Sequence, residues 1–203
     1  MLSGGILPIY RAGFRCNVVE LKIDASQSFG GLAEVAGFRT EILKRILSEI
    51  CPCKVHLRID WAMRGYRQPD LTAGDWAKFD DLFRDAPKGI SDLALQFTVD
   101  LNVPLNEYLT RILSMCAPLR VNRLEVHMNA PDIFVRYRNG GVGGQGYLRR
   151  VMRGMDIPLF ARQTAQHIPT LCVFVLGLPP GLKSQWRIAR SHFGDVRLDQ
   201  VEL

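Results

Sequence analysis

The sequence has no run of eighteen apolar residues, which argues against a helix that spans a membrane. Its opening segment, MLSGGILPIYRAGF, also lacks the basic start, apolar core and cleavage site of a secretory signal. The five cysteines are an odd number scattered over 203 residues, which is typical of free thiols in a reducing compartment rather than of a disulfide framework. We therefore expect a soluble intracellular protein, cytoplasmic or nuclear, that makes no contact with a membrane.

Signatures of catalysis are also missing. The four histidines are scattered singly, and no serine or cysteine lies in the sequence context of a nucleophile elbow or a catalytic triad. Cys51-Pro-Cys53 brings two thiols close together, but a structural zinc site needs four ligands and only His56 is near. These observations predict a protein that is not an enzyme and that uses no metal and no cofactor.

The charge is a weak indicator of the partner. A net charge of +6 and a pI near 9.3 favour acidic surfaces or nucleic acid, although 20 acidic residues are spread among 26 basic ones. Aromatic residues interrupt a set of arginines in the C-terminal third, namely Arg136, Arg138, Arg149, Arg150, Arg153 and Arg162. No established nucleic-acid-binding signature accompanies them, and arginines on helices usually form a solvated face. The sequence favours a protein partner over nucleic acid.

Four segments alternate apolar and polar residues as half-buried strands do. Their apolar positions hold Val19, Leu21 and Ile23; Val55, Leu57 and Ile59; Leu93, Leu95 and Phe97; and Leu124, Val126 and Met128. When Leu21, Leu57, Leu93 and Leu124 are taken as equivalent, the spacings are 36, 36 and 31 residues. The sequence therefore indicates a repeated unit.

Between these strands, apolar residues recur at helical spacing. Thr40 to Ile50 carries such a stripe, as does the segment from Pro104 to Cys116. A third, shorter helix is predicted after an N-cap at Asp75, and its apolar positions are Trp76, Phe79, Leu82 and Phe83. Loops are predicted at Ser26 to Gly31 and at Ala62 to Ala73.

Units of one strand and one helix become stable by stacking, with parallel strands on one side and helices outside. We therefore predict a single domain, residues 1–203, with the fold of an irregular leucine-rich-repeat-like α/β solenoid. Its units would span about residues 16–50, 51–86, 87–118 and 119–160. A C-terminal cap, residues 161–203, would close the sheet with a β-hairpin. A doubly wound sheet is the competing architecture, because it also alternates strands and helices.

The C-terminal third departs from the repeat. Asp132 to Arg138 is predicted as a short strand, and a helix is expected around Leu148, Val151, Met152 and Met155. Thr170 to Leu176 is apolar on both faces and should form a central strand. Gln185 to Arg190 and Val196 to Leu203 are predicted as a hairpin around a turn at Ser191 to Asp195.

Three stretches carry a family resemblance: SEICPCKVHLRID; DWAKFDDLF followed by ISDLALQF; and IPTLCVFVLGLP followed by QWRIAR and VRLDQVEL. They resemble the leucine-rich-repeat-like region of large families of mushroom (basidiomycete) proteins, many of them similar to F-box proteins. The resemblance covers most of residues 16–203 and rests chiefly on apolar spacing. It implies a recognition surface without catalytic residues, such as that of an F-box-type ubiquitin-ligase adaptor. FRTEILKRILSEI, residues 38–50, also resembles the opening of an F-box, although an ordinary repeat helix explains it too.

A glycine-rich loop supports an alternative of another class. Gly141, Gly143 and Gly146 fit G-x-G-x-x-G, and Arg149 follows them. Such a turn lets the backbone approach a phosphate, as in a small nucleotide- or phosphate-binding enzyme with a doubly wound sheet. The acidic residue expected about twenty positions later is missing, because Gln163 and Gln166 occupy that region. A surface loop is the preferred interpretation.

Overall fold

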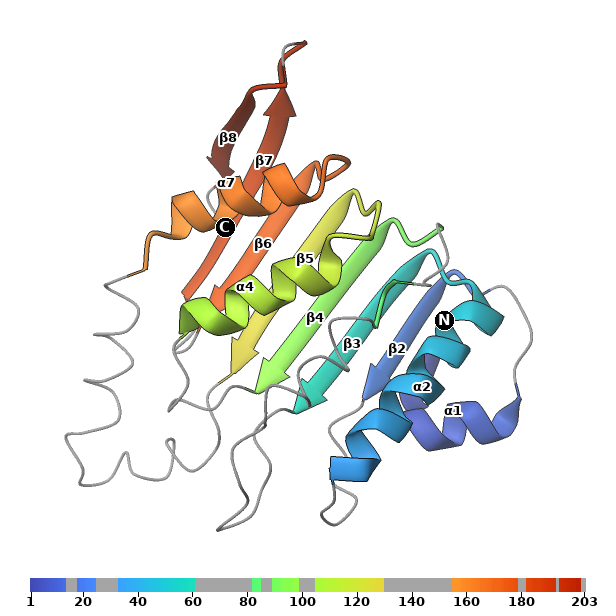
Figure 1. Cartoon of the computed structure of the whole chain (residues 1–203). Coiled ribbons are helices and arrows are strands. Elements are labelled where there is room, and N and C mark those ends of the chain that lie inside the picture. The colour runs from blue at the N-terminus through green and yellow to red at the C-terminus, as the bar shows by residue number, and fades with distance from the viewer. Residues whose placement is uncertain are drawn as a thin grey trace, which may run out of the picture.

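The computed structural model describes residues 1–13, 18–24, 33–60, 82–84, 89–98, 105–129, 155–178, 182–192 and 194–201. Within them, eight strands form one sheet whose spatial order follows the chain from β1 to β8. The elements are β1 (Leu2–Gly5), α1 (Ile6–Ala12), β2 (Glu20–Asp24), α2 (Ala33–Ile50), β3 (Lys54–Asp60), β4 (Asp92–Thr98), α4 (Leu105–Cys116), β5 (Arg123–Asn129), α7 (Ile157–His167), β6 (Val173–Leu178), β7 (Leu182–Arg190) and β8 (Val196–Val201). The protein is therefore an α/β protein built on one open sheet (Figure 1).

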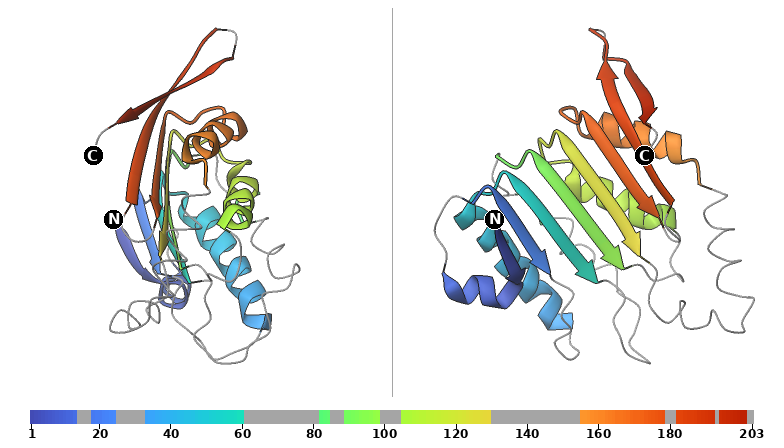
Figure 2. Two further views of the ribbon diagram at one scale, coloured as in Figure 1. Left: turned by 90° about the vertical axis from the view of Figure 1, so that its left-hand side faces the viewer. Right: turned by 180° about the vertical axis from the view of Figure 1, so that it is seen from behind.

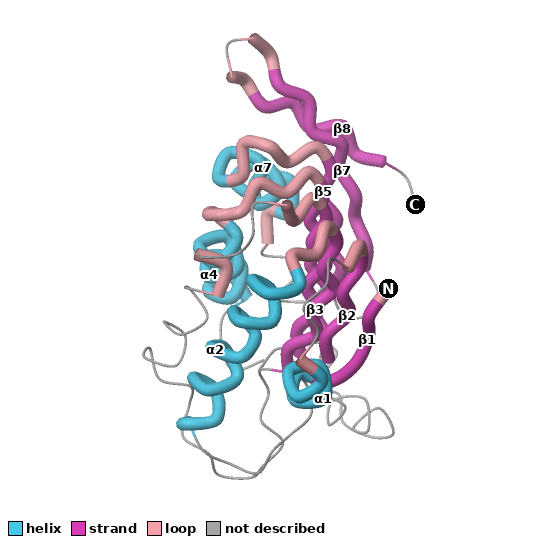
Figure 3. Tube along the Cα trace, turned by 90° about the vertical axis from the view of Figure 1, so that its right-hand side faces the viewer, coloured by secondary structure: helices cyan, strands magenta, loops and turns pink. Residues whose placement is uncertain are grey.

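Strands β1 to β6 pair in parallel, and the last two join them in antiparallel pairs. Helices α2, α4 and α7 all lie on one face of this sheet, and α1 lies beside α2 at the β1 end (Figures 1 and 2). No helix among the described residues covers the opposite face (Figure 3). We call that opposite surface the open face. Because the described strands lie in the sheet in the same order as in the chain, the sheet that they form has no topological switch point, the place where a doubly wound sheet reverses its strand order.

The core lies between the sheet and the helix layer. Alternate strand residues point into it, among them Leu21, Leu57, Leu95, Val126 and Phe174, each at most 1% exposed. Ile46 and Leu47 of α2 and Ile112 of α4 meet them from the helix side. Phe174 stacks on Trp186 at a ring-centroid distance of 5.7 Å, which extends the core under β7. The alternation that predicted half-buried strands is therefore confirmed at β2 to β5.

Two of the predicted helices are confirmed, those at residues 40–50 and 104–116. The apolar stripe of Thr40 to Ile50 is buried in α2, although α2 begins earlier, at Ala33. Cys51 then adopts a left-handed φ of 47° and its amide bonds the Leu47 carbonyl, which ends the helix before Pro52. α4 matches the predicted helix, with Leu109, Ile112 and Cys116 buried. Leu82 and Phe83 are buried within a turn, while residues 75–81 lie outside the described ranges.

The register of the repeat differs from the prediction. Leu57 pairs with Ile23 and Leu95, so it is not equivalent to Leu21 and Leu93. The residues in register are Leu21, Val55, Leu93, Leu124 and Phe174, with steps of 34, 38, 31 and 50 residues. The error was two residues at β3. A two-residue slip keeps every side chain on its own face, so the apolar pattern could not reveal it.

A recurrent arrangement of backbone hydrogen bonds lies at the starts of β4, β5 and β6, where one carbonyl accepts from two consecutive amides. The Cys53 carbonyl accepts from the amides of Ser91 and Asp92, at 2.8 and 3.2 Å. The Ser91 carbonyl accepts from Asn122 and Arg123, and the Asn122 carbonyl accepts from Cys172 and Val173. A hydroxyl group adds to this pattern before β6, where Thr170 Oγ1 donates to the Val121 carbonyl at 2.9 Å. Each of these carbonyls joins the residues before one strand to the residues before the next. The same backbone arrangement therefore repeats along this edge of the parallel sheet.

Three elements, β1, α1 and α7, and one position, Val19, were missed or misplaced. The predicted units begin at residue 16, but β1 pairs with β2 and α1 packs against α2 ahead of that point. α7, which crosses the predicted unit boundary at residue 160, begins at an Asp156 N-cap whose carboxylate accepts from the Leu159 amide at 2.8 Å. Val19 was placed on the buried side but is 67% exposed, because the strand begins only at Glu20.

The doubly wound alternative is wrong for this sheet. That architecture requires helices on both faces and a reversal of strand order, whereas here the order is sequential and α2, α4 and α7 share one face. The predicted central strand is confirmed as β6, between β5 and β7, although it begins at Val173. The predicted hairpin is confirmed as β7 and β8. The predictions for residues 26–31, 62–73 and 132–154 lie outside the described residues.

Arg190 anchors the hairpin to the helix layer. Its guanidinium donates to the Leu171 carbonyl at 2.6 Å, to that of Ala165 at 2.9 Å and to that of Ile168 at 3.0 Å. These carbonyls lie at the C-terminal end of α7 and in the segment that leads to β6, where helix carbonyls have no partner within the helix. One side chain therefore joins β7 to both elements.

Candidate functional site

The open face of the sheet is polar, since the side chains that alternate with the core residues point to it. Adjacent outward positions are filled by Glu20, Lys22 and Asp24 of β2; Lys54, His56 and Arg58 of β3; Asp92, Ala94 and Gln96 of β4; and Arg123, Glu125 and His127 of β5. Every one of them is exposed or half-buried. Parallel register brings these residues into rows across neighbouring strands, so groups far apart in sequence become neighbours.

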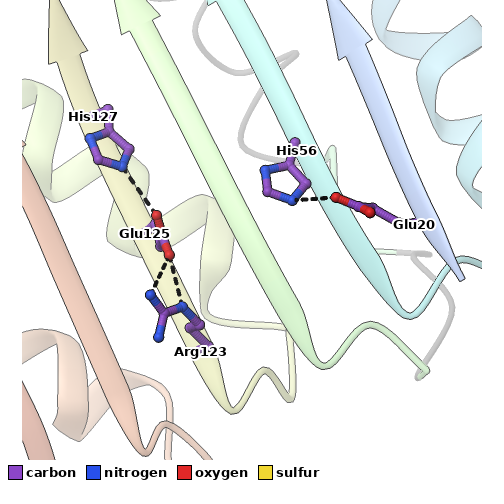
Figure 4. A network of polar contacts seen from close by, with 5 residues as sticks. All are labelled: Glu20, His56, Arg123, Glu125 and His127. Atoms are coloured by element: carbon purple, nitrogen blue, oxygen red, sulfur yellow. Dashed lines mark hydrogen bonds and ion pairs between the residues drawn. The ribbon is translucent and has the colours of Figure 1, made fainter. Parts of the chain in front are cut away.

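Two histidine–carboxylate pairs lie on this face (Figure 4). His56 Nε2 lies 3.3 Å from Glu20 Oε1, an oxygen that Lys22 Nζ also approaches at 3.3 Å. On β5, His127 Nε2 lies 3.2 Å from Glu125 Oε2, while Arg123 Nε and Nη2 bind Oε1 at 2.7 and 2.6 Å. In each pair one carboxylate is shared by an imidazole and a permanent cation.

These contacts set the acidity of the carboxylates. The hydrogen bond from Lys22 is the main cause that lowers the pKa of Glu20 below its ordinary value of 4.5, with smaller help from the His56 and Lys54 charges. For Glu125, partial burial tends to raise the pKa, but the hydrogen bonds from Arg123 and His127 together outweigh it, so its pKa is also lowered. Both carboxylates are therefore anionic near neutral pH, which suits them to hold cations and not to donate protons.

A hollow opens between the two pairs because β4 carries a small residue there. Ala94 is in register with His56 on one side and with Glu125 on the other. The hollow has a volume of about 290 Å³ and is lined by Ser3, Gly4, Lys22, Ile23, Asp24, His56, Leu57, Arg58, Ala94, Leu95, Gln96, Glu125 and His127. Since strands lie about 4.8 Å apart, the walls on β3 and β5 are separated by about 10 Å, enough to admit an extended peptide or a polar side chain.

The arrangement offers charged and hydrogen-bonding side chains. None of the described His, Cys, Asp and Glu residues gather in a group of three or more that could hold a metal ion. The thiol of Cys116 is buried on the helix side, and burial raises its pKa to about 12, so it stays protonated. Among the described elements, no helix combines the length and apolar character that a bilayer crossing needs.

Some of the candidate site residues predicted from the sequence lie outside the described residues, and the others lie in separate parts of the structure. Gly141, Gly143, Gly146 and Arg149, which carried the nucleotide alternative, lie outside the described residues. Cys51 and Cys53 are exposed free thiols on the turn between α2 and β3, and His56 points away to Glu20. His167 lies at the end of α7, where Nδ1 is 2.9 Å from the Gln163 carbonyl. Of the four described histidines, His56 and His127 line the hollow, whereas His167 and His192 are not among its lining residues.

The sequence reasoning missed the role of Glu20, Glu125 and Ala94. Each is an ordinary outward position of an alternating strand, and the available signal was the concentration of charge in KVHLRID and RLEVHMN.

Comparisons of the chain with protein-family models, with curated proteins and with solved structures return no match. The resemblance of residues 16–203 to the mushroom leucine-rich-repeat-like region therefore stays a prediction.

Proposed function

We propose that this chain is a non-catalytic protein-interaction scaffold that binds a partner protein on the open face of its sheet. The observation that carries the proposal is that α2, α4 and α7 lie on one face and leave the polar rows of β2 to β5, with the hollow over Ala94, uncovered by any described helix. A rigid sheet that presents side chains at fixed spacings is suited to recognition.

The proposal includes a leucine-rich-repeat-like class for the fold. Its support is the sequential parallel order of β1 to β6, the helices on one side, and the repeated carbonyl step at Cys53, Ser91 and Asn122. Repeat proteins of this kind commonly bind through an extended surface made by successive units. The open face of β2 to β5 is the corresponding surface here.

The family resemblance extends this proposal to the recognition region of an F-box-type ubiquitin-ligase adaptor. Residues 38–50, which resemble the opening of an F-box, form most of α2, and Ile42, Leu43 and Leu47 are buried in the core. This helix therefore uses its apolar stripe to cover the sheet. The open face supports the recognition role that the resemblance implies. Membership of a ubiquitin ligase is tested by co-purification with the adaptor subunit of a cullin-type ligase.

The experiment compares capture of proteins from a cell extract by three forms of the chain. Ala94→Gln fills the hollow without changing the charge, and Arg162→Glu alters an exposed position on α7 in the helix layer. We expect the same partner to be retained by the wild type and Arg162→Glu and to be lost with Ala94→Gln. Direct titration of that purified partner then establishes binding. Equal capture by all three forms, or turnover of a nucleotide by the wild type, would contradict the scaffold role.

A further inference from the structure

The charge on the open face is unevenly compensated. Glu20, Asp24, Glu125 and Asp199 each lie within 4.0 Å of a cationic side chain on the same face, and Asp92 accepts from Ser91 Oγ at 2.6 Å. Glu20, Glu125, Asp92 and Asp199 are therefore held closely by this protein's own groups, whereas Asp24 lies 4.0 Å from Arg58. Lys54 and Arg187, by contrast, form no ion pair within the described part of the chain. The face has more cationic than anionic capacity left for a partner.

Strand β3 concentrates that capacity, with His56 and Arg58 in the wall of the hollow and Lys54 two residues before His56 on the same strand. Its first three outward side chains are all basic or protonatable: Lys54, His56 and Arg58, all exposed. Arg58 approaches Asp24 only at 4.0 Å, with both side chains nearly half exposed, so water competes strongly for that pair. In Figure 4 the second ring nitrogen of His56 is on the β4 side, away from Glu20. Lys54 and Arg58 are thus available to donate to a ligand lying over β4, and the second ring nitrogen of His56 can do so in the imidazolium form of the ring.

The spacing of these donors matches an extended chain. Side chains on one side of a strand recur about every 7 Å, so Lys54, His56 and Arg58 form a row with the period of the same-side residues of an extended peptide. Ala94 and Gln96 form the floor next to this row, and Glu125 with His127 forms the opposite wall. A peptide that enters the hollow parallel to β3 would bring every second side chain to the basic row.

We propose that the hollow over Ala94 binds an extended segment of a partner protein with acidic residues at alternating positions, whose carboxylates pair with Lys54, His56 and Arg58. This inference rests on the proposed scaffold function and names the chemistry of the partner. Charge complementarity decides the occupant. Nucleic acid fits less well, because single strands bind to stacking platforms and no Phe, Tyr or Trp occupies a described outward position on β2 to β7.

The test uses two labelled, acetylated peptides of identical composition, one with glutamate alternating with serine and one with the glutamates contiguous. Fluorescence anisotropy with the full chain should give at least about fivefold tighter binding of the alternating peptide. Lys54→Glu and Arg58→Glu should each weaken that binding by about tenfold, through loss of one attraction and gain of one repulsion. Arg187→Glu is the matched control on β7 of the same face, and it should change the affinity less than about twofold.

Three results would overturn the inference: equal binding of both peptides, equal weakening by Lys54→Glu and Arg187→Glu, or tighter binding of single-stranded RNA that displaces the peptide. Ala94→Gln separates this inference from the scaffold function on which it rests. Loss of partner capture with Ala94→Gln, together with no binding of the alternating peptide, would retain the interface and reject the acidic occupant. Partner capture that survives Ala94→Gln would reject both. Each variant is compared with the wild type by urea unfolding, so that a folding defect is recognised separately.

Discussion

The His127 ring lies directly over Gly177, its neighbour in register on β6. A Cβ atom at residue 177 would come within 2.4 Å of His127 Nδ1, closer than any ordinary contact, so the ring occupies the space that a side chain would need. Glycine here therefore holds His127 in the orientation that brings Nε2 to Glu125.

Gly177→Ala should push the His127 ring away and break its contact with Glu125. Alanine itself favours a strand over glycine by about 0.5–1 kcal/mol, so the two effects oppose each other. We expect Gly177→Ala to lower the free energy of unfolding by about 1 kcal/mol when His127 is present. In a His127→Ala background the same substitution should raise it by about 0.5 kcal/mol. Urea unfolding of the double-mutant cycle measures this. The same effect in both backgrounds would show that the ring does not depend on Gly177.

Arg190→Met should lower the free energy of unfolding by about 2–3 kcal/mol. The substitution removes the guanidinium that donates to the carbonyls of Ala165, Ile168 and Leu171, of which Ile168 still accepts from the Leu171 amide. Arg187→Met on the same strand is the control, since Arg187 is exposed on the open face and should cost less than about 0.5 kcal/mol. Comparable losses for the two variants in urea unfolding would contradict the role given to Arg190.

The cysteines should differ in reactivity by location. Cys51, Cys53 and Cys172 are exposed, so an alkylating reagent at pH 8 should label them in the folded protein. Cys116 should remain unlabelled until urea unfolds the chain, because it is buried and its thiol has a pKa of about 12. Peptide mapping by mass spectrometry gives the order. Early labelling of Cys116 would show that α4 opens readily from the sheet.

Acid should weaken the fold through Glu125. Its pKa is lower in the folded chain than the ordinary value of 4.5, so the folded state binds its proton less readily than the unfolded state. The contribution is therefore complete above pH 4.5 and is lost as the pH falls through the folded pKa. After allowance for solvent screening we expect it to be no more than about 1 kcal/mol.

Glu125→Gln removes that titration. The variant should be less stable than the wild type at pH 7, and the difference should shrink below pH 4.5 as the wild-type carboxylate takes up its proton. Unfolding free energies of the two proteins across this pH range provide the measurement. A difference that is constant with pH would mean that Glu125 contributes by its shape and not by its charge.

The sequence predicted the elements with strong alternation or helical stripes and missed those with weak ones. β3, β4, β5 and α4 follow directly from their apolar spacing. β1 has the sequence LSGG, whose two glycines weaken the strand signal. Its pairing with β2, and not its own sequence, makes it a strand. α7 buries Ala161, Thr164 and Ala165, small residues that mark an apolar stripe poorly, although Asp156 and Pro158 do indicate a helix start.

The candidate site was harder to predict than the fold, because it depends on register. Glu20 and His56 are 36 residues apart in the sequence, and only the pairing of β2 with β3 brings them together. The hollow depends on Ala94 being flanked by larger residues on both neighbouring strands, which the two-residue uncertainty at β3 concealed. Spacing alone fixes the face of a side chain but not its neighbours across the sheet.

The sequential order of the strands also bears on how the chain can grow. Before β4, β5 and β6, a carbonyl just ahead of the preceding strand accepts the first amides of the new segment, as the Ser91 carbonyl accepts from Asn122 and Arg123. No earlier segment has to part to admit a later one, so folding can advance from unit to unit along the chain. In the same way, lengthening a connection or duplicating a unit need not disturb pairs already formed, and steps that range from 31 to 50 residues fit within one sheet.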